Sequence, residues 1–97
     1  MTEAQATEYL AECFWPGVLD SDLRQLDERI AEVAAELAGT GTSVRYLGSL
    51  LMRADEVVLC LFEGPEEAVR DAAQRAAVPF ERILEAARSP WPATECP

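Results

Sequence analysis

Two stretches of the chain repeat apolar residues at the three- and four-residue spacing that places them along one side of a helix. In the first, Asp20 offers a side-chain oxygen to the free amides of a helix start, and Gly39 and Gly41 suit the end. In the second, Pro65 suits a first helical position, and Pro79 ends the segment because it disfavours helical backbone in the residue before it. The apolar stripes of the two predicted helices are Leu23, Leu26, Ile30, Val33 and Leu37, and Ala68, Val69, Ala72, Ala73 and Ala76.

Other segments favour strands. Residues 8–17 are rich in aromatic side chains and close on a Pro-Gly pair, which is typical of a strand that ends in a turn. Residues 43–64 contain two apolar runs joined at Ala54-Asp55, and so short a loop requires antiparallel pairing. Residues 82–87 fit either a helix or a strand, and we assign a strand because the order of elements needs a fourth one.

The predicted hairpin is apolar on both faces. With a two-residue loop, Tyr46 lies opposite Glu63 and Leu50 lies opposite Leu59. An antiparallel sheet usually leaves one face to water, so a sheet that is apolar on both faces needs a second cover. We expect a second copy of the chain to supply it, in a symmetric homodimer. The alternation of side chains puts Tyr46, Leu50, Met52, Val57, Leu59 and Leu61 on one face, and Leu47, Leu51, Val58, Cys60 and Phe62 on the other.

The order of the predicted elements is that of a ferredoxin-like α+β fold, a β-α-β-β-α-β antiparallel sheet with two helices on one face. We expect a single domain over residues 8–88, with flexible termini at 1–7 and 89–97. The first residues lack the basic start and the apolar run of a secretory signal, and the longest apolar run, Val57 to Phe62, is too short to cross a bilayer. A cytoplasmic location is therefore expected.

The chain carries a net charge of −10 in 97 residues. This charge repels phosphate backbones and anionic lipid surfaces, so it argues against nucleic-acid and membrane binding. The cysteines, Cys13, Cys60 and Cys96, are odd in number and widely spaced, which predicts free thiols and neither disulfides nor a metal knuckle. Histidine is absent, so the most common general base and metal ligand is missing.

The most characteristic part of the sequence is Arg45 to Pro65, which reads RYLGS, a short acidic turn, then CLFEGP and the start of a helix. Together with EYLAECFWPG before it and AAVPFERILEA after it, this run resembles a small bacterial family of ferredoxin-like nickel-binding proteins, long catalogued as a domain of unknown function. The resemblance spans about Glu8 to Ala87 and implies a dimer of ferredoxin-like subunits that binds a divalent metal, nickel, with no established catalysis. Because imidazole best suits nickel among nitrogen and oxygen donors and this chain has none, no metal ligand is assigned.

Glu12 and Arg45 interrupt strands that are otherwise apolar, and a charge in such a place is usually paired or functional. In the ferredoxin-like strand order Glu12 lies near the last strand, where Arg82 or Arg88 could be its partner. One reading of these residues is therefore a structural ion pair or a solvated strand end.

The other reading is a ligand site. In it, Glu12, Tyr46 and Glu63 line a cleft of the sheet and contact a small ligand. The two acids at Asp55 and Glu56 are better explained as a solvated turn, because they lack the spacing of a calcium loop. The candidate ligand-binding residues are Glu12, Arg45, Tyr46 and Glu63, and no catalytic residue is assigned.

The leading functional hypothesis is a binding module that takes a divalent metal or a small solute in its sheet cleft or at its dimer interface. The first alternative is a cofactor-independent dimeric α/β-barrel enzyme, which has only fold analogy in its support. The second alternative is an acidic interaction domain that docks a basic partner. No serine lies in a GxSxG turn and no thiol has a visible activating base, so catalysis is the weaker expectation.

Overall fold

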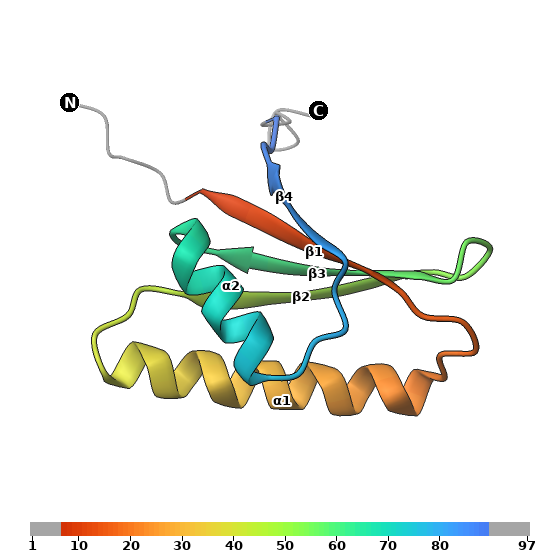
Figure 1. The fold of residues 1–97 in the computed structure, drawn as a ribbon, viewed down its shortest axis with the longest axis horizontal. Coiled ribbons are helices and arrows are strands. Elements are labelled where there is room, and N and C mark those ends of the chain that lie inside the picture. The colour runs from red at the N-terminus through yellow and green to blue at the C-terminus, as the bar shows by residue number, and fades with distance from the viewer. Residues whose placement is uncertain (1–6, 90–97) are drawn as a thin grey trace, which may run out of the picture.

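Both helices pack on the same side of an antiparallel sheet (Figure 1). The computed structural model describes residues 7–89 of the chain. The prediction of flexible termini concerns mainly residues 1–6 and 90–97, which lie outside the described part. The elements within residues 7–89 are β1 (Glu8–Phe14), α1 (Asp20–Gly39), β2 (Arg45–Met52), β3 (Val57–Glu63), α2 (Glu66–Arg75) and β4 (Arg82–Ala86).

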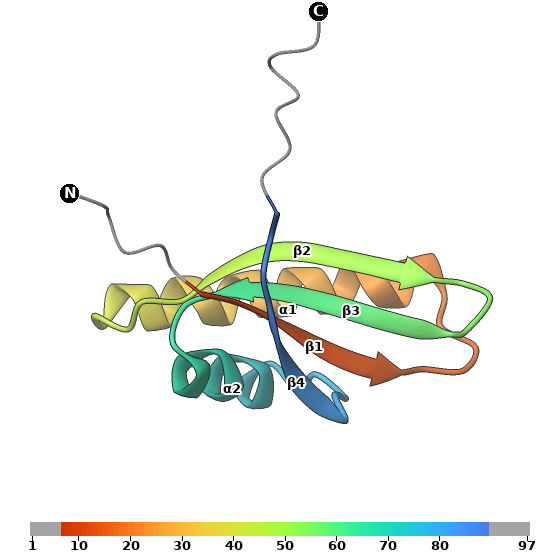
Figure 2. The same cartoon turned by 90° about the horizontal axis from the view of Figure 1, so that it is seen from above.

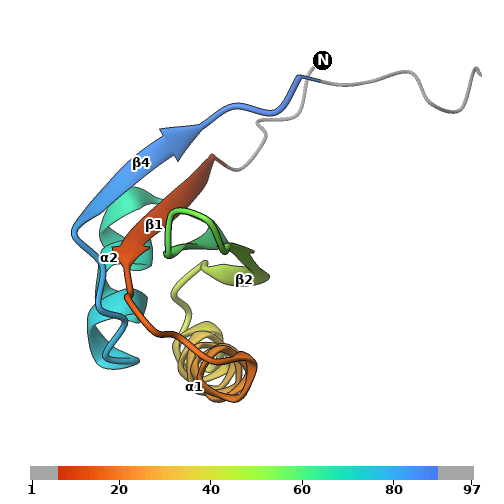
Figure 3. The ribbon, with the colours of Figure 1, turned by 90° about the vertical axis from the view of Figure 1, so that its right-hand side faces the viewer.

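The strands lie in the order β2-β3-β1-β4, and each neighbouring pair is antiparallel. α1 connects β1 to β2 and α2 connects β3 to β4, so each helix crosses over a strand that lies between the two it joins. Figure 2 views the sheet from its uncovered side, with α1 behind the strands and α2 next to β1 and β4, and Figure 3 shows the sheet and the helices as two layers. This arrangement confirms the predicted ferredoxin-like α+β fold.

The core lies between the sheet and the two helices. α1 buries Leu26, Ile30 and Leu37, which belong to its predicted apolar stripe, and α2 buries its whole predicted stripe. Neither of these helices, in the part of the chain described, combines the length and the apolar character that a membrane span requires. The buried residues are Ala11, Cys13, Leu26, Ile30, Ala34, Leu37, Val44, Val58, Cys60, Phe62, Ala68, Val69, Ala72, Ala73, Ala76 and Val78.

The start of α1 differs from the prediction. Leu19, and not Asp20, occupies the capping position, and its side chain has no oxygen to offer. Asp22 provides the hydrogen bond at this helix start instead: its Oδ2 accepts from the backbone N–H of Leu19 at 2.9 Å. Asp20 lies in the first turn, where the helix dipole favours a negative charge, and it pairs with Arg53 at 3.0 Å.

The end of α1 is closed by a glycine in left-handed backbone conformation. Gly41 has a φ of 94°, and the N–H of Thr42 donates to the Leu37 carbonyl at 2.9 Å. This bond satisfies a carbonyl that would otherwise lack a partner at the helix end. The prediction that glycines terminate the helix is confirmed at Gly41, whereas Gly39 is still helical.

α2 ends by the same motif, but with alanine in the left-handed position. Ala77 has a φ of 59°, and the N–H of Val78 donates to the Ala73 carbonyl at 2.9 Å. The last helical residue is Arg75. The prediction that Pro79 ends this helix is therefore wrong, because the backbone closes the helix before the proline is reached.

A β-bulge in β2 changes the register predicted for the hairpin. The pairing is irregular between Tyr46 and Gly48, and beyond it the partner of Glu63 is Arg45 and not Tyr46. Tyr46 instead lies opposite Phe62, which is buried beneath the helices. A one-residue irregularity moves the side chains beyond it to the other face, so Tyr46 does not share the face of Leu50 as predicted.

Nearer the turn the predicted register is confirmed, since Leu50 lies opposite Leu59. The loop itself is longer than predicted, because the strands stop at their pair Met52–Val57 and leave residues 53–56 between them. Within this loop Glu56, with a φ of 55°, takes the left-handed conformation that tight turns often require.

β4 is the strand assigned to the ambiguous segment 82–87, and it ends one residue earlier, at Ala86. It pairs with β1 in an antiparallel ladder in which Leu84 lies opposite Leu10. Just before it, the N–H of Glu81 donates to the Glu12 carbonyl at 2.8 Å. The fourth strand is therefore confirmed, and it brings the last described segment of the chain beside the first strand.

Candidate functional site on the open face of the sheet

The face of the sheet that the helices leave uncovered, here called the open face, carries apolar side chains from all four strands. The register places Leu61, Leu10 and Leu84 in one row across β3, β1 and β4. Leu50 is 63% exposed and Phe14 is 54% exposed, so the face lies open to solvent in the single chain. Its apolar side chains are Leu10, Phe14, Leu50, Met52, Val57, Leu59, Leu61, Leu84 and Ala86.

The carboxylates of the open face, among the described residues, each form an ion pair with an arginine. The two central strands supply the carboxylates, and the arginines come from the edge strand β2 and from β4 or the segment just after it. The charges of this face therefore cancel, whereas the chain as a whole carries −10. The pairs are Glu8–Arg88, Glu12–Arg82 and Glu63–Arg45.

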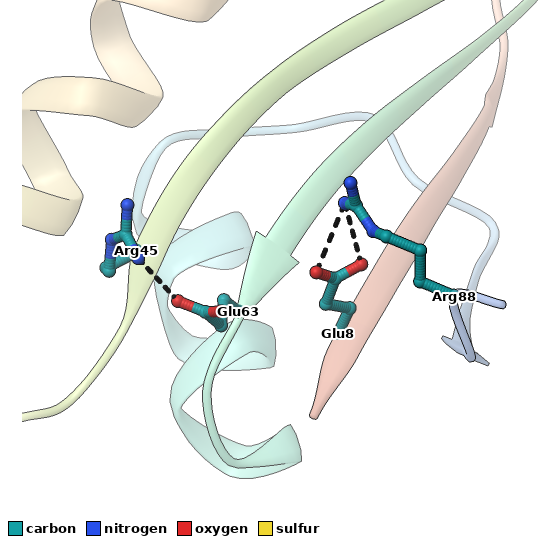
Figure 4. A network of polar contacts seen from close by, with 4 residues as sticks. All are labelled: Glu8, Arg45, Glu63 and Arg88. Carbon is teal, nitrogen blue, oxygen red and sulfur yellow. Dashed lines mark hydrogen bonds and ion pairs between the residues drawn. The ribbon is translucent and has the colours of Figure 1, made fainter. Parts of the chain in front are cut away.

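Four of these charged side chains lie in a row at one end of the open face (Figure 4). Glu8 and Glu63 are direct cross-strand partners, which places two like charges next to each other. Arg45 Nη1 donates to Glu63 Oε1 at 2.8 Å, and Arg88 Nη2 donates to both carboxylate oxygens of Glu8 at 3.0 and 3.2 Å. An arginine on each flank thus offsets the repulsion between the two carboxylates.

The structure does not bring together the three residues that the sequence placed along one cleft. Glu12 and Glu63 lie on the open face, but in different rows, because Glu12 is the cross-strand partner of Leu59. Tyr46 lies on the opposite face. Glu12 forms an ion pair with Arg82, which was one of the two partners predicted for it.

Tyr46, on β2, connects the sheet to α1. Its hydroxyl donates to Asp27 Oδ1, and its ring lies 5.2 Å from the ring of Phe62. Burial and the hydrogen bond to the Asp27 carboxylate both raise the pKa of Tyr46. The phenol therefore stays protonated at neutral pH and serves as a donor.

Cys13 and Cys60 are fully buried on the inner face, and both are free thiols as predicted. The hydrogen bond with the Cys13 thiol and burial both raise the pKa of Cys60. A thiol must lose its proton to act as a nucleophile or a metal ligand, so neither role suits Cys60 in this place. Cys96 lies outside the described residues.

Glu56 has a structural role that the sequence did not indicate. Its Oε2 accepts a hydrogen bond from the Gly17 N–H at 3.1 Å, and its carbonyl accepts one from the Trp15 N–H at 2.8 Å. These bonds tie the hairpin turn to the loop between β1 and α1, beside a hollow of about 140 Å³ that Glu56 and Arg53 line. The sequence showed an acidic turn at residues 55–56, but it did not show that the partners of Glu56 come from a distant segment.

The donor groups of the described residues do not fit a nickel centre. No three acidic or cysteine side chains in residues 7–89 gather so that they could hold a metal ion, and the sequence has no histidine. The two described thiols point into the core, and the carboxylates of the open face are bound to arginines. Nickel would need nitrogen or sulfur donors that this arrangement lacks.

Comparisons with known proteins identify relatives of the same architecture. A family model described as "Nickel responsive protein SCO4226-like" matches residues 9–86. The crystal structure of SCO4226 from Streptomyces coelicolor A3(2) superposes with a TM-score of 0.69 at 22% sequence identity, and the match covers 86% of this chain and 99% of that chain. At this identity the likeness concerns the fold. No curated protein matches the sequence.

Proposed function

Because the chain belongs to the family of SCO4226-like nickel-responsive proteins, we propose that it is a non-catalytic binding module whose working unit is a homodimer. The observation that carries this proposal is the open face. There the apolar side chains of four strands lie uncovered, and the charge of each described carboxylate is offset by that of an arginine. An antiparallel sheet with one solvated face normally carries polar side chains on that face. An apolar face is therefore expected to be covered by another molecule.

The distribution of charge favours a second copy as the cover. Two chains that each carry −10 repel each other, and this repulsion is smallest where they meet through a surface without net charge. The open face is such a surface, because each of its described carboxylates is neutralised by an arginine of the same chain. Covering it also removes leucine, methionine and phenylalanine side chains from water, which stabilises the pair by about 25 cal/mol for each Å² of apolar surface.

The same side chains set the kind of solute that two facing sheets would hold. Leu10, Leu59 and Leu61 occupy the middle of the open face and offer no hydrogen-bond partner or charge. Binding sites with such a lining accept ligands mainly through the burial of apolar surface. We therefore propose a small, uncharged and largely apolar solute.

Neither a catalytic role nor the docking of a basic partner has a comparable observation in its support. The carboxylates of the open face in residues 7–89 are engaged by arginines, so they are poorly placed to act as general bases. The negative charge of the rest of the chain is accounted for by a solvated surface that keeps a small protein in solution.

A thermal-shift screen tests the proposed binding. Uncharged apolar compounds are expected to raise the melting temperature of the wild-type chain, since a ligand that binds the native state alone stabilises it. Leu50→Glu, on the open face, should lose the shift, whereas Leu19→Glu should retain it. Leu19 is a matched control because it is 63% exposed, as Leu50 is, but lies at the start of α1. A shift produced by charged compounds alone, or one that Leu50→Glu leaves unchanged, would contradict the proposal.

A further inference from the structure

The open face differs from end to end, and its most exposed part lies nearest the hairpin turn. The register places Met52, Val57 and Phe14 side by side on β2, β3 and β1, in a row without a charged side chain. Leu50 lies in the next row and is more exposed than either Phe14 or Met52. We call these four residues the hairpin end. A cover over the hairpin end removes exposed apolar surface from water, which favours association.

The opposite end of the open face is charged and less exposed. The side chains of Glu8 and Glu63 are only 19% and 23% exposed, and Arg45 and Arg88 flank them (Figure 4). Across the sheet this charged row reads positive, negative, negative, positive, in the order Arg45, Glu63, Glu8, Arg88. The pattern is therefore the same in both directions.

A two-fold axis sets such a pattern against itself. In a symmetric dimer the same patch of both copies meets. If the axis runs along the strands, the partner presents the charged row in reverse order, and if the axis runs across the strands, each residue meets its own copy. In both cases, with the two rows in register, arginine meets arginine and glutamate meets glutamate. Like charges that face each other across an interface weaken it.

We propose that the two copies meet through the hairpin end of the open face, and that the charged row stays outside their contact. This inference rests on the proposed homodimer and adds to it which part of the surface forms the contact. The row of Met52, Val57 and Phe14 meets its own copy without opposing like charges, because it carries none. Phe14 is then the aromatic side chain that the contact buries, and such side chains carry much of the binding energy of interfaces.

Thiol protection at the two ends of β2 tests the inference. Met52→Cys and Arg45→Cys, each in a Cys96→Ser background, place one exposed thiol at either end of the open face. The rate of labelling by Ellman's reagent is compared well below and well above the dimer dissociation constant. We expect association to slow labelling of Met52→Cys about tenfold or more and that of Arg45→Cys by less than about twofold, because a covered thiol is out of reach of the reagent.

Truncation of Phe14 is an independent test with a matched control. Phe14 and Leu19 are 54% and 63% exposed, but only Phe14 lies on the open face. Sedimentation equilibrium should show that Phe14→Ala raises the dimer dissociation constant about tenfold or more, whereas Leu19→Ala changes it by less than about twofold. Circular dichroism checks that both variants are folded, and Met52→Ala repeats the test if Phe14→Ala is not.

The outcomes separate this inference from the proposed homodimer. A wild type that stays monomeric overturns both. A dimer in which Arg45→Cys is protected as strongly as Met52→Cys overturns the inference alone, because the charged row then lies inside the contact. A dimer that Phe14→Ala leaves as tight as the wild type does the same, since the hairpin end then contributes nothing to association.

Discussion

Tyr46, Cys13 and Cys60 lie on the inner face of the sheet, which packs against the helices. Tyr46 donates its hydroxyl proton to Asp27 on α1, and Cys13 and Cys60 are fully buried between the sheet and the helices. Polar groups in such places stabilise the fold only while their partners are present, so substitutions should reveal them as structural residues.

Tyr46→Phe should lower the free energy of unfolding by about 1 kcal/mol at neutral pH, because the hydrogen bond to Asp27 is lost. The pKa of Tyr46 is raised in the folded protein by burial and by this bond. The stability that the phenol contributes is therefore complete below the pKa of the unfolded chain, near 10, and declines as the pH rises above it. Urea denaturation across this range should show the difference between wild type and variant shrinking above about pH 10, and a constant difference would contradict the assignment.

The buried thiols should be inert in the native state. In a Cys96→Ser background, Cys13 and Cys60 are the cysteines that remain. Both are shielded from solvent, and the raised pKa of Cys60 keeps its reactive thiolate scarce. Ellman's reagent should label neither at neutral pH until guanidinium unfolds the chain. Labelling of the folded protein within seconds would show that this part of the core opens.

The charged residues of the open face were partly predictable from the sequence. Glu12 and Arg45 stood out because they interrupt apolar strands, whereas Glu63 was predicted only as part of a cleft. The strand order offered Arg82 and Arg88 as partners of Glu12, and the structure pairs it with Arg82. Glu8 was missed because it lies at a strand end, where a charge is unremarkable, and its partner depends on the β1–β4 register. The register between two strands that are distant in the sequence cannot be read from the properties of individual residues.

At the scale of elements, the two helices end by the same backbone motif with different residues. Gly41 closes α1 and Ala77 closes α2, both in left-handed conformation. Glycine adopts this conformation without the steric cost that the Cβ of alanine brings. The helix ends therefore differ in strain, although their hydrogen bonds are alike.

Ala77→Gly should raise the free energy of unfolding by about 0.5–1 kcal/mol, because it relieves the left-handed alanine. The reciprocal change, Gly41→Ala, should lower it by about 1 kcal/mol or more. No atom lies within 4 Å of the Cβ position at Gly41, so the cost there is that of the backbone alone. Urea midpoints measure both variants, and destabilisation by Ala77→Gly would contradict the argument.

The helices and strands were predictable from periodicity, whereas the bulge in β2 was not. The segment RYLGSLLM has apolar residues at both parities, so a shift of one residue leaves either face apolar and the pattern cannot detect it. Gly48, with a φ of 120°, was the one local signal in this strand. Tyr46 was therefore assigned to the wrong face and to a cleft that it does not line.

At the scale of the whole molecule, helices cover the sheet on one side only (Figure 2). The other side carries an apolar surface whose charged side chains are paired. The unpaired negative charge of the described residues thus lies away from the surface through which two copies are proposed to meet. Apolar contact holds such a dimer together, and long-range repulsion opposes it.

Association should therefore strengthen as salt is added. Raising the ionic strength from about 0.01 M to 0.15 M shortens the Debye length from about 30 Å to about 8 Å and screens the repulsion between two chains of like charge. The dimer dissociation constant, measured by sedimentation equilibrium at several salt concentrations, should fall accordingly. Weaker association at higher salt would show that ion pairs between the copies hold them together, and not apolar contact.

Sedimentation velocity at micromolar concentration tests the central proposal most directly, with wild type, Leu50→Glu and Leu19→Glu compared side by side. Leu50 and Leu19 are equally exposed, but only Leu50 lies on the open face. The wild type and Leu19→Glu are predicted to sediment with twice the mass of one chain, and Leu50→Glu as a folded monomer. A monomeric wild type, or a Leu50→Glu chain that remains dimeric, would contradict the proposal that two copies meet through the open face.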